Sequence, residues 1–420
     1  MYNLEFGKLH ITPKGNKYIL VENNHKGMIR LECSIRRGSN LDPKGKEGLH
    51  HFLEHMLFKG TDNMNSEEFN NKMKYYGAEH NAMTSPSETS YHINALSDYL
   101  EEVSELFFKS FSTPALLFTN SEDLKLEEER SVILEEISMY QTPDSLVNIK
   151  MENLLLHGVN KEYMKTIGNE DSVNSITKED LIEAYMGYNK EDILLIVCAN
   201  QDDPNITDDS LLKLIENYED YFEVFQDQSS RADGLVFHKD INHSEVIEGL
   251  PYNAVVMAYD IPVTELEVYS VFNNYVRMLD QILFNEVREK LGLCYYIGSM
   301  PIVLENPDTR VLNIITTTEQ PNKASTMIEH IMKNFKDYVT EDIFHGTVVE
   351  CKRHILKQDR IQDINYKMAR YLYNKDFNFD SFMHIIDKYM TYENFLNFID
   401  KIDLSRNSML IFKKGVENNV

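Results

Sequence analysis

The sequence predicts an α+β protein built from two similar domains, each a mostly antiparallel sheet covered by helices. Strand-forming runs are followed by helix-forming runs, and this order occurs twice along the chain. The 420 residues also exceed the length that one hydrophobic core usually organises. A polar segment (QDQSSRADGLVFHKDINHS) separates the two patterns. We therefore expect a first domain at 1–225, a linker at 226–244 and a second domain at 245–420.

In the first pattern, runs of apolar, β-branched and aromatic residues predict strands. Gly77 is a typical stop after a helix, and Thr177 with Asp180 resembles a capping box that opens a short helix ending near Gly187. Ser112 to Ser121 shows no periodicity and is expected to be irregular. Strands are expected at 17–22, 29–35, 79–85, 89–95 and 192–199, and further helices at 48–58, 66–76, 96–111 and 124–140.

The second pattern opens with a strand and a capping box. Thr264 with Glu267 predicts the start of a long helix that runs to about Lys290 and is ended by Gly292. Strands are expected at 254–261, 293–298, 311–317 and 408–412, and further helices at 323–338, 341–357 and 380–401.

Charge and composition exclude some classes of function. Apolar residues make up 42% and charged residues 26%, as in ordinary globular proteins. The net charge of -26 argues against nucleic-acid binding, because phosphate contacts require clustered Lys and Arg. Such a charge favours cationic peptides as ligands, although most of it is expected on the solvated surface.

The N-terminal segment, the apolar runs and the cysteines of the sequence favour a cytoplasmic location. The N-terminus lacks the apolar stretch of a signal peptide, and no apolar run approaches the roughly 20 residues of a membrane span. The four cysteines form no Cys-x-x-Cys pair, so neither a thiolate zinc site nor a redox motif is indicated. They are Cys33, Cys198, Cys294 and Cys351. A reducing cytoplasm, with no membrane partner, is the expectation.

The strongest chemical signal is the segment His51-Phe52-Leu53-Glu54-His55. Residues four apart share a helix face, so His51 and His55 can bind one ion. Glu54 lies beside them and is in reach of a water molecule on that ion, as a general base. Neutral imidazole is a good zinc ligand, and this order of residues is the inverted zinc-peptidase signature. The plain alternative is that these side chains merely occupy one helical turn.

A catalytic zinc site needs a third protein ligand, and the helix expected at 124–140 offers several glutamates. Glu129 and Glu136 lie seven residues apart on its apolar face, whereas Glu128 and Glu135 are rotated toward solvent. A carboxylate on an apolar face needs a partner. We therefore expect Glu136 to bind the metal and Glu129 to support the site, with Glu135 and Glu129 as alternative ligands. That apolar face is expected to contain Val132, Ile133, Ile137 and Tyr140.

The segments HHFLEHMLFKGT and EERSVILEEISMY resemble the inverzincin peptidases, a family that includes pitrilysin, insulysin and the mitochondrial processing peptidase. The resemblance covers most of the chain, in the same order. It implies a zinc endopeptidase in which His51, His55 and Glu136 bind Zn²⁺ and Glu54 is the base. An inserted loop at 112–121 would account for the distance between His55 and Glu136.

Two further motifs agree with this resemblance. EHNAMTS is similar to the Asn-Ala-x-Thr edge strand of the family, which implies that Asn81 and Ala82 contact a peptide substrate by backbone pairing. VREKLGLCYYIGS is similar to the Arg-Glu-Lys-x-Gly-Leu-x-Tyr segment, which implies that Arg288 and Tyr295 reach the substrate and the developing oxyanion. Taken alone, the first motif is also explained as a strand and turn, and the second as helix C-capping by Arg288 and packing by Tyr295.

The resemblance also implies an assembly. In the family, four such domains enclose a chamber, and this chain resembles one half. A dimer is therefore implied, with the zinc of one subunit completed by the arginine and tyrosine of the other. A homodimer is our first expectation and a heterodimer with a related subunit the second. The expected activity is hydrolysis of unfolded peptides, in maturation or in degradation, and the alternative is a non-catalytic peptidase-like scaffold or peptide-binding subunit.

Overall fold

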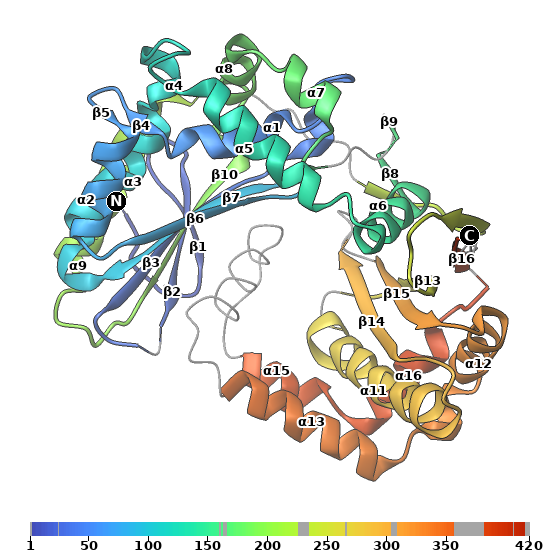
Figure 1. Cartoon of the computed structure of the whole chain (residues 1–420). Coiled ribbons are helices and arrows are strands. Elements are labelled where there is room, and N and C mark those ends of the chain that lie inside the picture. The colour runs from blue at the N-terminus through green and yellow to red at the C-terminus, as the bar shows by residue number, and fades with distance from the viewer. Residues whose placement is uncertain are drawn as a thin grey trace. The chain divides into compact units, whose positions relative to one another are not determined.

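The computed structural model describes residues 2–23, 25–158, 161–162, 166–225, 235–264, 267–303, 309–356, 382–405 and 407–415. These residues divide into two compact units (Figure 1). Within the described residues, unit 1 contains 2–138 and 166–225, and unit 2 contains 139–162, 235–356 and 382–415. Each unit is a mostly antiparallel sheet with helices, so the predicted fold class is confirmed.

Unit 1 is built on a six-stranded sheet with the order β1-β2-β10-β3-β7-β6. Its strands are β1 (Leu9–Ile11), β2 (Lys17–Glu22), β3 (Met28–Ile35), β6 (Glu79–Thr84), β7 (Thr89–Leu96) and β10 (Ile193–Ala199), and β4 (Gly60–Thr61) pairs separately with β5 (Met64–Asn65). Its helices are α1 (Leu49–Leu57), α2 (Ser66–Tyr75), α3 (Leu100–Ser112), α4 (Ala115–Phe118), α5 (Leu126–Met139), α7 (Glu170–Ser175), α8 (Lys178–Met186) and α9 (Asp208–Tyr221). Short 3₁₀ turns are η1 (Ser39–Leu41), η2 (Ser97–Tyr99), η3 (Lys190–Asp192) and η4 (Phe222–Val224).

The core of unit 1 lies between one face of the sheet and the helices. Every residue of β10 is buried, as its continuous apolar sequence predicts for a central strand. On β3, alternate residues point into the main core, where Leu31 and Cys33 pack with Phe52 of α1 and Phe107 of α3. This packing fixes α1 on the sheet and leaves its remaining face for other chemistry.

Unit 2 contains a five-stranded sheet with the order β12-β16-β13-β15-β14 and a three-stranded sheet with the order β11-β8-β9. The strands are β8 (Leu156–Gly158), β9 (Lys161–Glu162), β11 (Leu235–Phe237), β12 (Asn242–Ile247), β13 (Asn253–Pro262), β14 (Tyr296–Val303), β15 (Thr309–Thr318) and β16 (Asn407–Lys414). The helices are α6 (Pro143–Leu155), the π-helix η5 (Val268–Phe272), α11 (Asn273–Leu283), the π-helix η6 (Phe284–Lys290), α12 (Pro321–Lys333), the 3₁₀ turn η7 (Phe335–Tyr338), α13 (Glu341–Leu356), α15 (Phe382–Tyr389) and α16 (Tyr392–Lys401).

Helices cover both faces of the larger sheet of unit 2. Val147 and Met151 of α6 pack on one face, against Val256 and neighbouring residues of the sheet. The other face is buried against α11, α12, α15 and α16. The described residues of unit 2 therefore form three layers, helix–sheet–helix. No helix in the described ranges combines the length and apolarity needed to cross a membrane.

The two units repeat one topology. In unit 1, the first pair of the series β2-β10-β3-β7-β6 is parallel and the three following pairs are antiparallel. In unit 2, the same holds for the series β12-β16-β13-β15-β14. Helix α1 follows β3 as α11 follows β13. This identity of order and direction confirms the duplication inferred from the sequence.

Several local predictions were wrong. The stretch 112–121 contains the short helix α4. The helix expected at 380–401 is two helices, because Thr391 caps a new helix at α16. The strand expected at 293–298 begins only at Tyr296, because Gly292 has a φ of 58° and ends η6 with a turn.

The division into domains at 1–225 and 245–420 stays a prediction. Residues 226–234 of the expected linker lie outside the described residues, and its second part forms β11 and the start of β12. Helix α6 and strand β8 belong to unit 2, although they follow α5 of unit 1 directly in the sequence.

Candidate metal centre

The helix that carries the inverted motif is anchored at its N-terminus by a buried aspartate. Asp42 accepts hydrogen bonds from the backbone N–H groups of Gly48 (2.8 Å) and His50 (3.0 Å) and pairs with Nδ1 of His50 at 2.6 Å. Gly48 itself has no side chain to cap α1, and a Cβ there would lie 2.6 Å from the carbonyl oxygen of Ile167. Asp42 therefore supplies the cap from outside the helix. The ring of His50 thus faces Asp42.

Helix α1 buries its apolar residues in the core and presents His51, Glu54 and His55 together. The imidazole rings of His51 and His55 lie 4.7 Å apart between centroids, with the edge of one ring toward the face of the other. His51 is 9% exposed, and its Nδ1 atom is buried without a hydrogen-bond partner among the described residues. The i, i+4 spacing places both rings on one side, as the sequence predicted.

Helix α5 brings two of its glutamates to this side. Glu129 is buried and Glu136 is half-buried, whereas Glu128 and Glu135 are exposed. The predicted orientation of the four carboxylates is therefore confirmed. The predicted apolar face was wrong in two members, because Val132 and Tyr140 are each 49% exposed.

The donor atoms of His51, His55 and Glu136 converge. Oε2 of Glu136 lies 3.7 Å from Nε2 of His51 and 3.8 Å from Nε2 of His55, and one ligand atom from each residue falls within 4.8 Å of the others. Bonds of about 2.0–2.2 Å in a tetrahedral zinc site separate neighbouring ligands by roughly 3.3 Å. The three side chains thus fit a zinc ion with small adjustments. Among the described residues, they form the group that could hold a metal ion, called here the candidate metal-binding group.

The pKa values of the two histidines are shifted in opposite directions. Burial, followed by the nearby His55, lowers the pKa of His51 to about 3, so its imidazole is neutral and ready to bind a metal. Burial also lowers the pKa of His55, but the hydrogen bond to Glu129 and the charges of Glu54, Glu129 and Glu136 outweigh this, and its pKa is raised. Binding of a metal ion to His55 competes with protonation of its ring.

Glu129 orients His55. Oε1 of Glu129 lies 2.7 Å from Nδ1 of His55, which leaves Nε2 of His55 facing Glu136. The other oxygen of Glu129 pairs with the ammonium group of Lys59. Burial raises the pKa of Glu129. The hydrogen bonds from His55 and Lys59 lower this pKa by more than burial raises it, so the net shift is downward. A carboxylate that fixes the ring of a histidine ligand in this way is common around zinc.

Glu54 has the environment of a general base. Burial raises the pKa of its carboxyl group, and the charge of Glu136 acts in the same direction. Hydrogen bonds from Thr84 and the charge of His55 lower this pKa, but the net shift is upward. The Thr84 hydroxyl donates to Oε2 of Glu54 at 2.7 Å. A carboxylate with a raised pKa beside a metal-binding group is suited to accept a proton.

The residues that the edge-strand motif singled out lie on β6. This strand ends the sheet, so its outer edge is not paired with another strand of the described residues. Asn81 is exposed and Ala82 is half-buried. The ring of His80, on the same strand, lies 4.8 Å from that of Phe58 between centroids.

Arg288 and Tyr295 belong to unit 2 and lie together there. The Arg288 guanidinium carbon is 4.6 Å from the ring centroid of Phe284 and 5.5 Å from that of Tyr295. Tyr295 is 84% exposed. Its expected place in a strand was wrong, because the residue precedes β14. Gly292 turns the chain after η6, and Tyr295 lies beside Arg288. The half-buried Arg288 and the exposed Tyr295 form a cation–aromatic pair.

Sequence reasoning missed three residues of the site: Asp42, Lys59 and Thr84. Thr84 stands inside the quoted segment EHNAMTS, and its spacing of two from Ala82 places both on one face of the strand. Lys59 stands four residues after His55, and this spacing was the sequence signal that it could lie near His55. No local pattern connects Asp42 to the helix that it caps.

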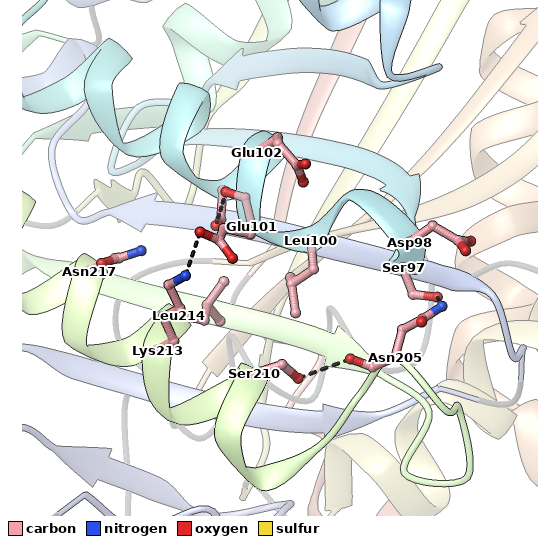
Figure 2. A pocket seen from close by; sticks show the side chains of 11 residues that line it. Ser97, Asp98, Leu100, Glu101, Glu102, Asn205, Ser210, Lys213, Leu214 and Asn217 are labelled. Atoms are coloured by element: carbon pink, nitrogen blue, oxygen red, sulfur yellow. Dashed lines mark hydrogen bonds and ion pairs between the residues drawn. The ribbon is translucent and has the colours of Figure 1, made fainter.

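Unit 1 also contains a cavity of about 270 Å³ away from this centre, between the N-terminal parts of α3 and α9 (Figure 2). Its wall is polar, with Lys213 paired to Glu101 and Asn205 bonded to Ser97. None of the residues of the metal-binding group lines it. The chemistry of the inverted motif is therefore not housed in this cavity.

An inverted His-x-x-Glu-His motif on a helix, joined by a distal glutamate, defines the inverzincin class of metallopeptidase sites. Comparison with known families agrees. The family model described as Insulinase (Peptidase family M16) matches residues 18–167, and the model described as Peptidase M16 inactive domain matches residues 175–348. The chain belongs to peptidase family M16.

Relatives in sequence are named as zinc proteases. An uncharacterized zinc protease of Bacillus subtilis is 24% identical over 376 residues, which are 86% of this chain and 86% of that protein. An uncharacterized zinc protease of Rickettsia felis is 26% identical over 332 residues, 74% of this chain and 72% of that protein. An insulin-degrading enzyme homolog of Dictyostelium discoideum is 28% identical over 84% of this chain, which corresponds to 36% of the longer relative.

Solved structures share the fold. A protease from Helicobacter pylori superposes with a TM-score of 0.79 at 20% identity, over 97% of this chain and 99% of that chain. Pitrilysin superposes with a TM-score of 0.71 at 14% identity, over 98% of this chain and 46% of that chain. The two-unit architecture is thus that of M16 peptidases.

Proposed function

We propose that this protein is a zinc-dependent endopeptidase that hydrolyses unfolded peptides. The observation that carries the proposal is the convergence of donor atoms from His51, His55 and Glu136 within 4.8 Å, beside the carboxylate of Glu54. The names of the relatives support zinc as the ion. Maturation of a peptide and general degradation are both consistent with this activity.

The residues of unit 1 divide the chemistry among them. A zinc ion held by His51, His55 and Glu136 would supply Lewis acidity for the scissile carbonyl and would lower the pKa of the attacking water. Glu54 takes a proton from that water and later delivers it to the leaving amine. Glu129 keeps the ring of His55 turned so that Nε2 faces Glu136.

The substrate is an extended peptide segment. The outer edge of β6 offers backbone groups for strand addition, with Asn81 and Ala82 as the contacts. A folded protein rarely presents such a free segment, so unfolded peptides are the preferred class. The net charge of -26 favours cationic sequences among them.

Completion of the site requires Arg288 and Tyr295, which we infer to act on the substrate as donors toward the developing oxyanion. The exposure of Tyr295, with the half-buried Arg288 beside it, supports this role. We infer that they serve the metal centre of a partner subunit in a dimer, a homodimer first and a heterodimer with a related subunit second.

The first test is metal content and peptide cleavage of the purified chain. We expect about one zinc ion per chain, cleavage of unstructured peptides, loss of cleavage after chelation and recovery when zinc is returned. A chain that binds zinc and cleaves nothing would indicate a missing partner subunit. A chain that binds no metal would favour the alternative function, a non-catalytic peptidase-like scaffold or peptide-binding subunit.

Changing Tyr295 to Phe should lower kcat about 10²–10³-fold, the loss typical for one oxyanion donor. Zinc content should not change, because Tyr295 and the metal-binding group lie in different units. Tyr296→Phe is the matched control, since Tyr296 is the adjacent exposed tyrosine. Unchanged kcat in Tyr295→Phe would mean that hydrolysis does not use this residue.

The same variant tests the dimer. Glu54→Gln and Tyr295→Phe chains, each inactive alone, are mixed and allowed to exchange subunits. If Tyr295 acts on the partner's centre, one site of each mixed dimer is intact, and about a quarter of wild-type activity returns. If activity does not return although mixed dimers form, the residue acts within its own chain.

A further inference from the structure

The side chain of Thr84 connects the edge strand to the carboxylate of Glu54. Its hydroxyl donates to Oε2 of Glu54 at 2.7 Å, a usual distance for an O–H···O hydrogen bond. We propose that Thr84 is a positioning residue, which holds the general base in place and ties it to the strand on which the peptide pairs. This inference rests on the proposed function.

A glutamate base needs such a restraint. Glu54 is half-buried and its carboxylate stands at the end of three rotatable bonds, so packing of α1 alone does not fix the direction of the two oxygens. The hydroxyl of Thr84 bonds to Oε2 of Glu54, and the backbone of Thr84 also bonds to this carboxylate. Preorganised orientation of this kind lowers a barrier without changing the chemistry of the base.

The position of Thr84 on β6 sets the direction in which its hydroxyl meets Glu54. Side chains on β6 alternate, with Ala82 and Thr84 half-buried and Asn81 and Met83 exposed. Thr84 and Ala82 therefore share the face that is turned toward the core, and Thr84 is the last residue of the strand. Its β-branched side chain has few χ1 choices, so the direction of the hydroxyl follows the backbone of β6.

Among the described residues, β6 pairs with another strand on one side. Thr84 pairs with Thr89 of β7, and the outer edge of β6 is where a peptide would add. A bound peptide would hold this strand from its second side and thereby fix the hydroxyl that holds Glu54. The base is thus best aligned when the substrate strand is in place, which links peptide binding to the catalytic step.

The test compares Thr84→Val, which keeps the shape and removes the donor, with Thr84→Ser, which keeps the donor. We expect Thr84→Val to lower kcat about 10–100-fold with KM within about threefold, as for loss of one hydrogen bond to a charged group. Zinc content and thermal stability should match wild type, and Thr84→Ser should recover kcat to within about threefold. An unchanged kcat in Thr84→Val, an equal loss in both variants, or loss of zinc would each overturn the proposal.

A structural readout separates this inference from the proposed function. If wild type cleaves peptides and Glu54→Gln does not, the proposed function holds and the kcat values decide the role of Thr84. If wild type cleaves no peptide, the proposed function fails, and crystal structures of zinc-loaded wild type and Thr84→Val decide instead. A Glu54 carboxylate that is displaced or split between orientations in Thr84→Val supports positioning, and an unmoved carboxylate overturns it.

Discussion

Replacing Glu54 by Gln should remove peptide hydrolysis while the chain keeps its zinc. Glutamine has the same shape and can still accept a hydrogen bond from Thr84, but its amide cannot take a proton from water. We expect kcat to fall by at least about 10²–10⁴-fold, the usual contribution of a general base. The measurement is kcat and KM on an unstructured peptide, together with zinc per chain by atomic spectroscopy.

A control for this variant is available on the neighbouring strand. Glu79→Gln changes an exposed glutamate of β6 and should leave kcat near the wild-type value. Thermal unfolding of both variants should show that the fold is retained. If Glu54→Gln keeps more than about a tenth of wild-type kcat, another group removes the proton and the role given to Glu54 is wrong.

Three glutamates of α5 should respond to substitution in a graded series. Glu136→Gln should lose zinc, because a neutral amide replaces the charged carboxylate among the three ligands. Glu129→Gln should bind zinc about 10–100-fold more weakly, because the carboxylate that orients His55 is lost. Glu135→Gln should bind zinc as wild type does, since Glu135 is exposed. Competition with a chromogenic chelator gives the zinc affinity of each chain.

The series also carries its own check on folding. All three changes lie on one helix and remove one charge each, so a general loss of helix stability would affect them alike. Glu129 is buried and bonded to Lys59, so its variant requires a melting curve before its zinc affinity is interpreted. Zinc loss in Glu135→Gln with normal binding by Glu136→Gln would contradict the ligand assignment and favour the neighbouring glutamate.

Most elements of the fold could be predicted because their signals are local. The apolar run ILLIVCA lies in the strand expected at 192–199, and β10 forms there and is buried along its whole length. The capping box of Thr177 with Asp180 predicted the start of α8 and is present with both hydrogen bonds. The repeated order of strands and helices predicted the duplication that the matching sheets display.

Other elements were not predictable from such signals. Helix α6 follows α5 in the sequence, yet its apolar residues pack on the sheet of unit 2. The exposure of Val132 and Tyr140 also depends on which side of α5 meets the core. Periodicity identifies an apolar face but does not say what covers it, because burial is decided by segments distant in the sequence.

The sequence alone determined the arrangement of His51, Glu54 and His55, because the pitch of an α-helix fixes which side chains share a face. It also limited the choice of the third metal ligand to the glutamates of one helix. Tertiary structure decided that Glu136 meets the two histidines, that Glu129 reaches His55 and that Thr84 reaches Glu54. The physical reason is that spacing within a helix follows from local backbone geometry, whereas distances between separate elements follow from the packing of the core between them.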